Sequence, residues 1–179
     1  MGKRGGNLNE IIQRRTKMNI TFRTYKKEDI PFLKDIWNDI LIGGVAFPGE
    51  VLYEEQTFEK MLEEQSAVTC ILVNNEVAGY FILHPNNIGR CSHVANASYA
   101  ISKEYRGRKL AEPLVKKSLE QAKELGFRGM QFNAVVTGNI AAIHTYQKAG
   151  FKIIGTIPQG FRLKNGVYSD MHIMYIPLI

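Results

Sequence analysis

The segment EYRGRKLAEPLVKKSLEQAKELGF, residues 104–127, places three basic side chains around one glycine directly before a helical pattern. The first turn of a helix exposes backbone N–H groups that have no intrahelical partner, and the helix dipole is positive there. Arg106, Arg108 and Lys109 would therefore repel one another unless an anion were bound between them. Gly107 would let the backbone approach that anion closely. The segment predicts an anion site, for which a diphosphate is the natural ligand.

The position of Pro113 supports this interpretation. A proline in a helix interior loses a hydrogen bond, but near the fourth helical position its missing N–H costs little. The helix is therefore predicted to begin at 108–110, with the N–H groups of 108–111 pointing out of its end. The alternative is a solvated basic turn without a ligand. Neither of the glycine patterns G-x-x-x-x-G-K-[ST] and G-x-G-x-x-G occurs in the segment.

The elements that must position this turn follow from the hydrophobic spacing. Strands are predicted at 19–25, 66–73, 77–83, 92–102, 130–136, 151–157 and 167–176. Helices are predicted at 27–41, at 54–65, from 108–110 to the stop at Gly126, and at 139–150. Asn74-Asn75 predicts a hairpin turn, and 42–53 predicts a Gly/Pro loop. This order of elements predicts a mixed sheet covered by helices.

Composition limits the class of protein. The chain has 179 residues, of which 45% are hydrophobic, so it is long enough for one globular domain with a real core. No apolar run approaches the roughly 20 residues that span a bilayer, so no membrane association is expected. Cys70 and Cys91 match no metal or redox spacing and indicate reduced thiols in an intracellular, cytoplasmic protein.

Basic charge is concentrated at the start of the chain. The formal net charge of +6 lies mostly in residues 1–18, which are rich in Gly, Asn and Arg. We expect this leader to be disordered and residues 19–179 to form the domain. The body is not a basic surface of the kind that binds nucleic acid, although binding of RNA or DNA by the leader alone stays an alternative.

Two segments resemble a known family. Arg106-Gly107-Arg108-Lys109-Leu110-Ala111 resembles motif A of the GCN5-related N-acetyltransferase (GNAT) superfamily, whose [QR]-x-x-G-x-[GA] amides bind the coenzyme A pyrophosphate. Lys109 stands where the middle glycine is usual. TGNIAAIHTYQKAGFKIIGTIP, residues 137–158, resembles motif B. The resemblance extends over 19–178 and implies the α/β GNAT fold, a mixed and mostly antiparallel sheet of about seven strands flanked by four helices.

The resemblance also implies an activity and a binding site. The implied activity is an N-acetyltransferase that uses acetyl-CoA as co-substrate, with direct attack by an amine and no metal. The strands at 93–102 and 130–137 are expected to splay apart, so that the pantetheine arm enters between them and a backbone N–H polarises the thioester carbonyl. The implied coenzyme A contacts are Tyr99, Ala100, Ile101, Arg106, Gly107, Arg108, Lys109, Leu110, Ala111, Asn139 and Tyr146.

Tyr146 and Asn139 each have two interpretations. Tyr146 resembles the superfamily tyrosine that donates a proton to the coenzyme A sulfur, and the alternative is a tyrosine that only packs. Asn139 lies two helical turns before it on the same face. It either caps the helix alone or caps it and also contacts pantetheine.

The general base is less well defined. Many members that act on small amines have a glutamate on the strand before motif A, where this chain has Asn96. An asparagine cannot accept a proton at neutral pH. Deprotonation is then assigned to water, to His93 or to Glu50, or it is unnecessary for a weakly basic amine.

The acceptor side resembles a narrower group. GRCSHVANASYAI and QFNAVVTGN are similar to the azetidine-2-carboxylate (proline-analogue) N-acetyltransferases of fungi, which implies that Asn96 and Asn133 face the acceptor. An amide can donate to a carboxylate and accept from an amine, which suits an amino acid. Phe47 and Glu50 are expected in a wall formed by the 42–53 loop, and the alternative is a plain hydrophobic lid. The catalytic set is therefore Tyr146, Asn96 and Asn133.

Three alternative functions are consistent with these features. The first is acetylation of a small amine, an amino acid or an analogue. The second is acetylation of a protein or peptide amine, which needs an open groove instead of a pocket closed by the 42–53 and 158–170 segments. The third is non-catalytic binding of acyl-CoA. A homodimer is suggested only by likeness to the superfamily.

Overall fold

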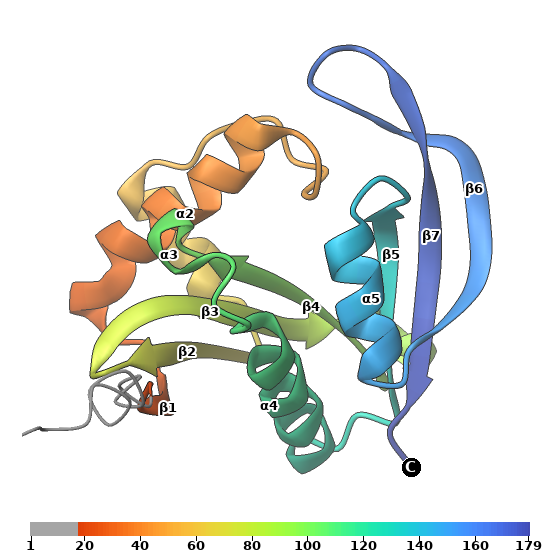
Figure 1. Ribbon diagram of the computed structural model, residues 1–179. Coiled ribbons are helices and arrows are strands. Elements are labelled where there is room, and N and C mark those ends of the chain that lie inside the picture. Colours follow the sequence, from red (N-terminus) through yellow and green to blue (C-terminus); the bar gives the residue numbers. More distant parts are fainter. Residues whose placement is uncertain (1–17) are drawn as a thin grey trace, which may run out of the picture.

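A computed structural model describes residues 18–179, and its centre is a seven-stranded mixed sheet (Figure 1). The order across the sheet is β1-β2-β3-β4-β5-β7-β6. The strands are β1 Ile20–Thr24, β2 Ala67–Val73, β3 Glu76–Pro85, β4 Val94–Ile101, β5 Gly129–Val136, β6 Lys152–Arg162 and β7 Tyr168–Pro177. The α-helices of this range are α2 Ile30–Gly43, α3 Glu55–Glu63, α4 Ala111–Glu124 and α5 Ile140–Lys148. Short 3-10 turns are η1 Lys27–Asp29, η2 Gly89–Cys91 and η3 Lys103–Tyr105.

The pairing of the strands confirms the predicted mixed sheet. All neighbouring strands are antiparallel except β4 and β5, which are parallel. The four flanking helices of the described range were also predicted. Asn74 and Asn75 both have positive φ, 52° and 72°, as a two-residue hairpin turn of type I′ requires.

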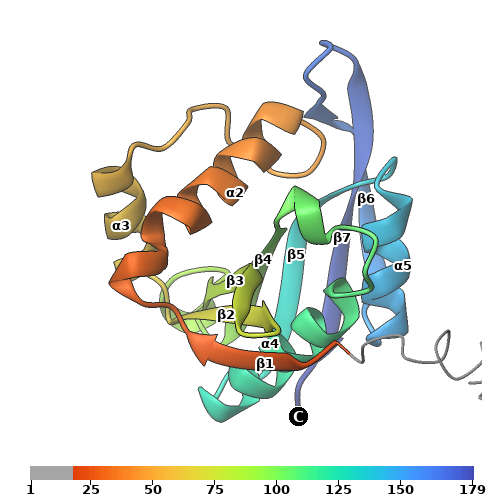
Figure 2. The same cartoon turned by 60° about the vertical axis from the view of Figure 1, so that its left-hand side comes forward.

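Helices cover both faces of the sheet. α2 and α3 pack on one face, here called the α2 face, and α4 and α5 pack on the other, called the α4 face (Figures 1 and 2). On the α2 face, the rings of Trp37 and Tyr80 lie 6.3 Å apart, and the hydroxyl of Tyr80 donates to the carbonyl of Leu33. On the α4 face, Leu114 and Phe132 belong to one buried cluster. The sheet therefore separates two cores.

The helix α4 differs in two details from the prediction. α4 begins at Ala111 and not at 108–110, because Gly107 and Lys109 have φ of 77° and 61°, outside the range of a right-handed helix. The spacing of small and apolar residues in this segment predicts an inward stripe at Ala111, Val115, Ser118, Ala122 and Leu125, and Val115, Ser118 and Ala122 are buried. Its last member, Leu125, is 48% exposed because the helix ends before it.

The closing hairpin is longer than predicted. β6 continues to Arg162, beyond the predicted end at 157, and stays paired with β7 as far as Tyr168. Of the predicted leader, residues 1–17 lie outside the described range. Between Met18 and Ile179, no helix has the length and apolarity needed to cross a membrane.

Candidate active site

The central feature of the sheet is a gap between β4 and β5. The two parallel strands pair only at Val94 with Gly129 and at Ala95 with Met130, and beyond those pairs they diverge (Figure 1). β5 also contains a bulge, because its register with β7 shifts between Phe132 and Val135. The predicted splaying of these strands is therefore present, and the inner edge of β4 has no strand beside it.

The register of β4 decides which of its backbone groups face this gap. The carbonyl of His93 accepts a hydrogen bond from the residue before β5, whereas the carbonyl of Val94 accepts one from the loop after β3. Backbone groups alternate in direction along an antiparallel strand, and no bulge interrupts the β3–β4 pairing. The N–H groups of Ala97, Tyr99 and Ile101 therefore point into the gap. They provide an unpaired strand edge for an extended ligand.

Ala100 has a different environment from its two neighbours. It is paired with Tyr80 of β3, so its own N–H faces β3 and not the gap. Its side chain is fully buried in the core of the α2 face. Three residues of β4 were predicted to contact coenzyme A. Tyr99 and Ile101 line the gap, whereas Ala100 does not.

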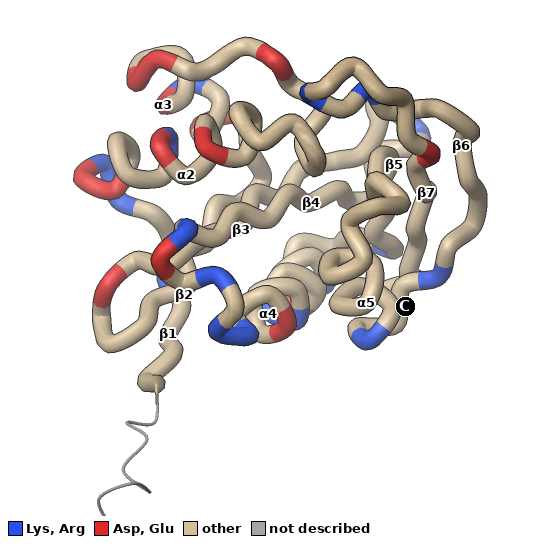
Figure 3. Tube along the Cα trace, turned by 45° about the horizontal axis from the view of Figure 1, so that its top comes forward, with Lys and Arg blue, Asp and Glu red and all other residues tan. Residues whose placement is uncertain are grey.

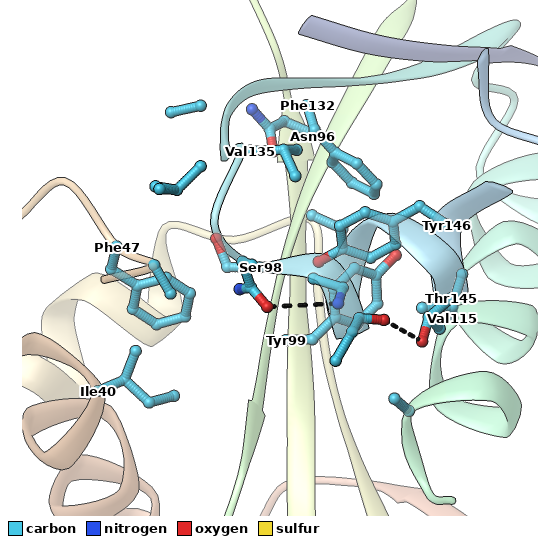
Figure 4. A pocket seen from close by; sticks show the side chains of 18 of the residues that line it. Ile40, Phe47, Asn96, Ser98, Tyr99, Val115, Phe132, Val135, Thr145 and Tyr146 are labelled. Carbon is cyan, nitrogen blue, oxygen red and sulfur yellow. Dashed lines mark hydrogen bonds between the residues drawn. The ribbon is translucent and has the colours of Figure 1, made fainter. Parts of the chain in front are cut away.

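A cavity of about 640 Å³ occupies the gap and extends from α5 to the 44–53 loop (Figure 4). Its walls come from β4, β5, α4, α5, α2 and this loop. Ile40 and Phe47 lie on the wall opposite Thr145 and Tyr146. Predicted site residues that line it are Tyr99, Ile101, Arg106, Ala111, Asn139, Tyr146, Asn96, Asn133 and Phe47.

The turn before α4 lies at one end of the cavity, where Arg106 and Ala111 line it. Within the described chain, no N–H group of residues 107–112 donates a hydrogen bond to backbone or side chain. Leu110 is 2% exposed and packs in the core of the α4 face, which anchors the turn. Unpaired N–H groups on an anchored turn are the geometry that the predicted anion site requires, and the bound anion itself stays a prediction.

Basic residues follow one another along the turn that leads into α4 (Figure 3), and their side chains have different partners. Arg106 donates through Nε to the carbonyl of Ile101 at 3.1 Å, which joins the turn to the end of β4. Arg108 lies over the ring of Tyr105 at 4.9 Å from its centroid. Lys109 has no ion-pair partner among residues 18–179.

One carboxylate stands in the first turn of α4. Glu112 forms an ion pair with Lys148 of α5 at 2.6 Å, and this hydrogen bond lowers the pKa of Glu112 below its usual range. The positive charge of Lys148 offsets the negative charge of Glu112, which would otherwise repel an anion at the turn. It also connects the two helices that flank the cavity.

Two tyrosines meet at the centre of the cavity but have different hydrogen bonds. Ser118 donates its hydroxyl proton to the carbonyl of Val115, so Tyr99 must donate to Ser118, at 2.7 Å. Tyr146 projects from α5 into the cavity, and its hydroxyl has no protein partner in the described residues (Figure 4). Burial raises the pKa of Tyr146 well above its usual range, so the phenol stays protonated. Tyr146 is therefore the hydroxyl with a proton available to a ligand.

The start of α5 supports the position of Tyr146. The side chain of Asn139 accepts a hydrogen bond from the N–H of Ala142 at 3.3 Å, so it caps the helix as predicted. Asn139 also lines the cavity. The rings of Phe132 and Phe151 lie 4.5 Å and 5.9 Å from that of Tyr146 and hold it in place.

Amide side chains gather at the other end of the cavity, on the α2 face. Asn96 and Asn133 both donate to the side-chain oxygen of Asn86, at 2.9 Å and 2.6 Å. Asn86 belongs to the loop after β3, and its role was not predicted. A single asparagine in a turn-rich loop gives no sequence signal of a contact with two distant strands.

His84 is a second residue that the sequence analysis missed. It is paired with Asn96 across β3 and β4 and lines the cavity. Its Nδ1 lies 2.9 Å from the carbonyl oxygen of Pro85. A carbonyl only accepts hydrogen bonds, so Nδ1 carries the proton and Nε2 is free to accept one. By contrast, His93 is exposed and does not line the cavity.

The 44–53 loop forms part of the cavity wall on the side of α2. Gly44 accepts a hydrogen bond from the N–H of Lys164 at 3.2 Å, and Glu50 forms an ion pair with Arg162 at 2.5 Å. Glu50 therefore tethers the loop to the end of β6 and does not line the main cavity. Phe47 lines it and packs on Trp37, with ring centroids 4.4 Å apart.

The chain is similar to known acetyltransferases. Residues 30–151 match the profile of the acetyltransferase (GNAT) family. N-acetyltransferase aca1 of Schizosaccharomyces pombe is 26% identical over 148 residues, covering 73% of this chain and 71% of that protein. L-amino acid N-acetyltransferase AaaT of Escherichia coli is 27% identical over 130 residues, covering 73% and 78%. The structure of a GCN5-related N-acetyltransferase from Kribbella flavida gives a TM-score of 0.82 at 28% identity, covering 88% of this chain and 97% of that chain.

The described residues contain no group of three or more His, Cys, Asp or Glu side chains that could hold a metal ion. The cavity instead offers an unpaired strand edge, unpaired N–H groups at a helix start and a protonated phenol. Groups of these kinds suit an extended anionic ligand that accepts hydrogen bonds.

The left-handed conformation of Lys109 has a measurable cost. An L-residue at positive φ is destabilised by about 1–2 kcal/mol, whereas glycine adopts this conformation freely. Lys109→Gly and Lys109→Ala remove the same charge, but only the glycine relieves the backbone. We expect the Gly variant to have a free energy of unfolding about 1 kcal/mol above that of the Ala variant, measured by urea denaturation. Equal stability of the two variants would contradict the observed φ.

Proposed function

The chain belongs to the GNAT family of acetyltransferases, and we propose that it transfers the acetyl group of acetyl-CoA to the amine of a free amino acid or a close analogue. Membership of the family supports the general reaction, which is acetyl-CoA-dependent N-acetylation. The amino-acid acceptor is supported mainly by the paired amides of Asn96 and Asn133 on the α2 face of the cavity. The similarity to an L-amino acid N-acetyltransferase agrees with this acceptor.

The residues at the turn before α4 fit the diphosphate of acetyl-CoA. Six consecutive residues, 107–112, have N–H groups without partners, and three basic side chains stand beside them. We assign the diphosphate to this turn, with Arg106 and Lys109 adding charge. We assign the pantetheine arm to the gap-facing N–H groups of Tyr99 and Ile101. When bound, acetyl-CoA supplies an activated acetyl thioester.

The acceptor is assigned to the α2 face of the gap. An amide presents both a carbonyl oxygen and N–H groups, so asparagines hold an amine and a carboxylate at the same time. Asn96 and Asn133 offer such groups, whereas Arg106 is the single Lys, Arg, Asp or Glu in the described cavity wall and lies at the other end. A neutral, amide-lined end favours a small zwitterion over a highly charged acceptor.

The acceptor ammonium first loses one proton to become the free amine. The reaction then forms the N–C bond and breaks the C–S bond, while the nitrogen loses a second proton and the sulfur gains one. We assign the loss of the ammonium proton to His84, whose Nε2 is free to accept it. A gap-facing N–H of β4 stabilises the negative charge that develops on the carbonyl oxygen. The phenol of Tyr146 donates to the departing sulfur. Each of these groups lines the cavity or borders it.

The closed wall also supports a small acceptor. The 44–53 loop is joined to β6 and the residues after it by the contacts of Gly44 with Lys164 and of Glu50 with Arg162. A peptide would need the open groove that these contacts block. Acetylation of a protein amine is therefore the less favoured alternative.

A panel of free amino acids, their carboxamides and short peptides tests the acceptor class. The carboxamides keep the amine but lose the carboxylate, and in peptides the carboxylate is no longer next to the amine. A hydrogen bond to a charged group contributes about 1.5–3 kcal/mol. We expect kcat/KM for the preferred free amino acid to exceed that for its carboxamide about tenfold or more. Acetylated products are identified by mass spectrometry. Faster acetylation of peptides than of any free amino acid would reject the proposal.

Tyr146→Phe removes only the hydroxyl assigned to the departing sulfur. We expect kcat to fall about 10²-fold while the Kd for acetyl-CoA stays unchanged, because proton donation is needed only during reaction. Tyr80→Phe is the matched control, since Tyr80 is also buried and lines none of the cavities. An unaltered kcat in Tyr146→Phe would remove this residue from the mechanism.

His84→Gln removes the proposed base but keeps a polar side chain. At neutral pH we expect kcat to fall about 10²-fold. At alkaline pH the loss should shrink, because the free amine is then already deprotonated. His172→Gln is the control, since His172 of β7 lines none of the cavities. A loss that is the same at every pH would exclude a role as base.

A further inference from the structure

Asn86 connects the two strands whose separation creates the site. It lies in the loop directly after β3, and its backbone N–H donates to the carbonyl of Val94 at 2.7 Å. Its side-chain oxygen accepts one hydrogen bond from β4, through Asn96, and one from β5, through Asn133. The ladder between β4 and β5 has already ended at Ala95. A single oxygen therefore bridges the strands where the gap begins.

This bridge fixes how both amides are oriented. The amide nitrogen of Asn96 donates to Asn86 at 2.9 Å, and that of Asn133 donates at 2.6 Å. Gln131 in turn donates to the side-chain oxygen of Asn133 at 2.8 Å. The side-chain oxygen of Asn96 is left with no donor among the described residues. Without the bridge, the amide of Asn96 could turn over and exchange its oxygen for its nitrogen.

The free oxygen of Asn96 has a specific chemical preference. A carbonyl oxygen accepts N–H groups and repels a carboxylate. It lies on the α2 face of β4, and its residue lines the cavity beside His84. An acceptor amine, once deprotonated, donates one N–H to this oxygen and keeps its lone pair for attack.

We propose that Asn86 is a positioning residue that selects amine acceptors, because it receives the N–H groups of Asn96 and Asn133 and thereby turns the oxygen of Asn96 toward the acceptor amine. This inference rests on the proposed function, which places the acceptor beside Asn96. Asn86 itself does not line the cavity and touches no substrate. Its effect is on acceptor recognition and not on acetyl-CoA.

Two substitutions separate this role from a general structural one. Asn86→Ala removes the bridging oxygen, and we expect the KM for the preferred amino acid to rise about tenfold, with the KM for acetyl-CoA within about twofold of the wild type. Asn86→Asp keeps an oxygen that accepts both N–H groups, so its KM for the amino acid should stay close to the wild-type value. Thermal melts of both variants report whether the fold is kept.

The side-chain amide signals of Asn96 and Asn133 in ¹⁵N NMR spectra give a readout that needs no activity. Their N–H protons should exchange slowly in the wild type and in Asn86→Asp, and faster in Asn86→Ala. If Asn86→Ala does not fold, the test rests on Asn86→Asp. A large rise in the KM for the amino acid in Asn86→Asp would then contradict the proposal.

The outcomes also distinguish the two proposals. An unchanged acceptor KM in Asn86→Ala, or an equal rise for acetyl-CoA, overturns the positioning role. An Asp variant as impaired as the Ala variant shows that Asn86 donates instead of accepting, which also overturns it. If the wild-type protein acetylates no amino acid, the proposed function fails, while the NMR exchange rates still report whether Asn86 orients the amides.

Discussion

The site depends on one constraint: β4 has backbone N–H groups on its inner edge that no neighbouring strand satisfies. Unpaired backbone groups are costly when buried, so a strand edge inside a sheet must find another partner. The pairing with β5 ends after Ala95, and the bulge of β5 directs that strand away. The result is a cavity of about 640 Å³ whose wall is a strand edge, placed between the two layers of helices. An extended ligand that pairs with this edge completes the sheet.

The other groups of the site are arranged around this gap by the order of elements. Because β4 and β5 are parallel, the starts of α4 and α5 both follow the diverging ends of the strands. Charge lies at one end, where the turn before α4 holds Arg106 and Lys109. Neutral amides lie at the other end, on the α2 face. In the proposed function, this division separates recognition of acetyl-CoA from recognition of a small acceptor, with Tyr146 between the two.

Local sequence patterns were sufficient to predict the order of the strands and helices, the buried positions of α4 such as Val115, and the cap at Asn139, because spacing and caps are properties of short segments. The start of α4 was missed because Lys109 adopts a left-handed conformation that its residue type does not favour. The roles of Asn86, His84 and Glu50 depend on contacts between distant segments. Glu50 meets Arg162 across 112 positions of sequence, which no local pattern encodes.

Amide hydrogen exchange along β4, with and without acetyl-CoA, tests the central claim most directly. The N–H groups of Tyr99 and Ile101 face the gap and should exchange rapidly in the free protein and slowly once acetyl-CoA is bound. The N–H of Ala100 faces β3 and should be protected in both states. Protection of all three residues in the free protein, or no change at Tyr99 and Ile101 on saturation with acetyl-CoA, would contradict the claim that this strand edge is the binding track.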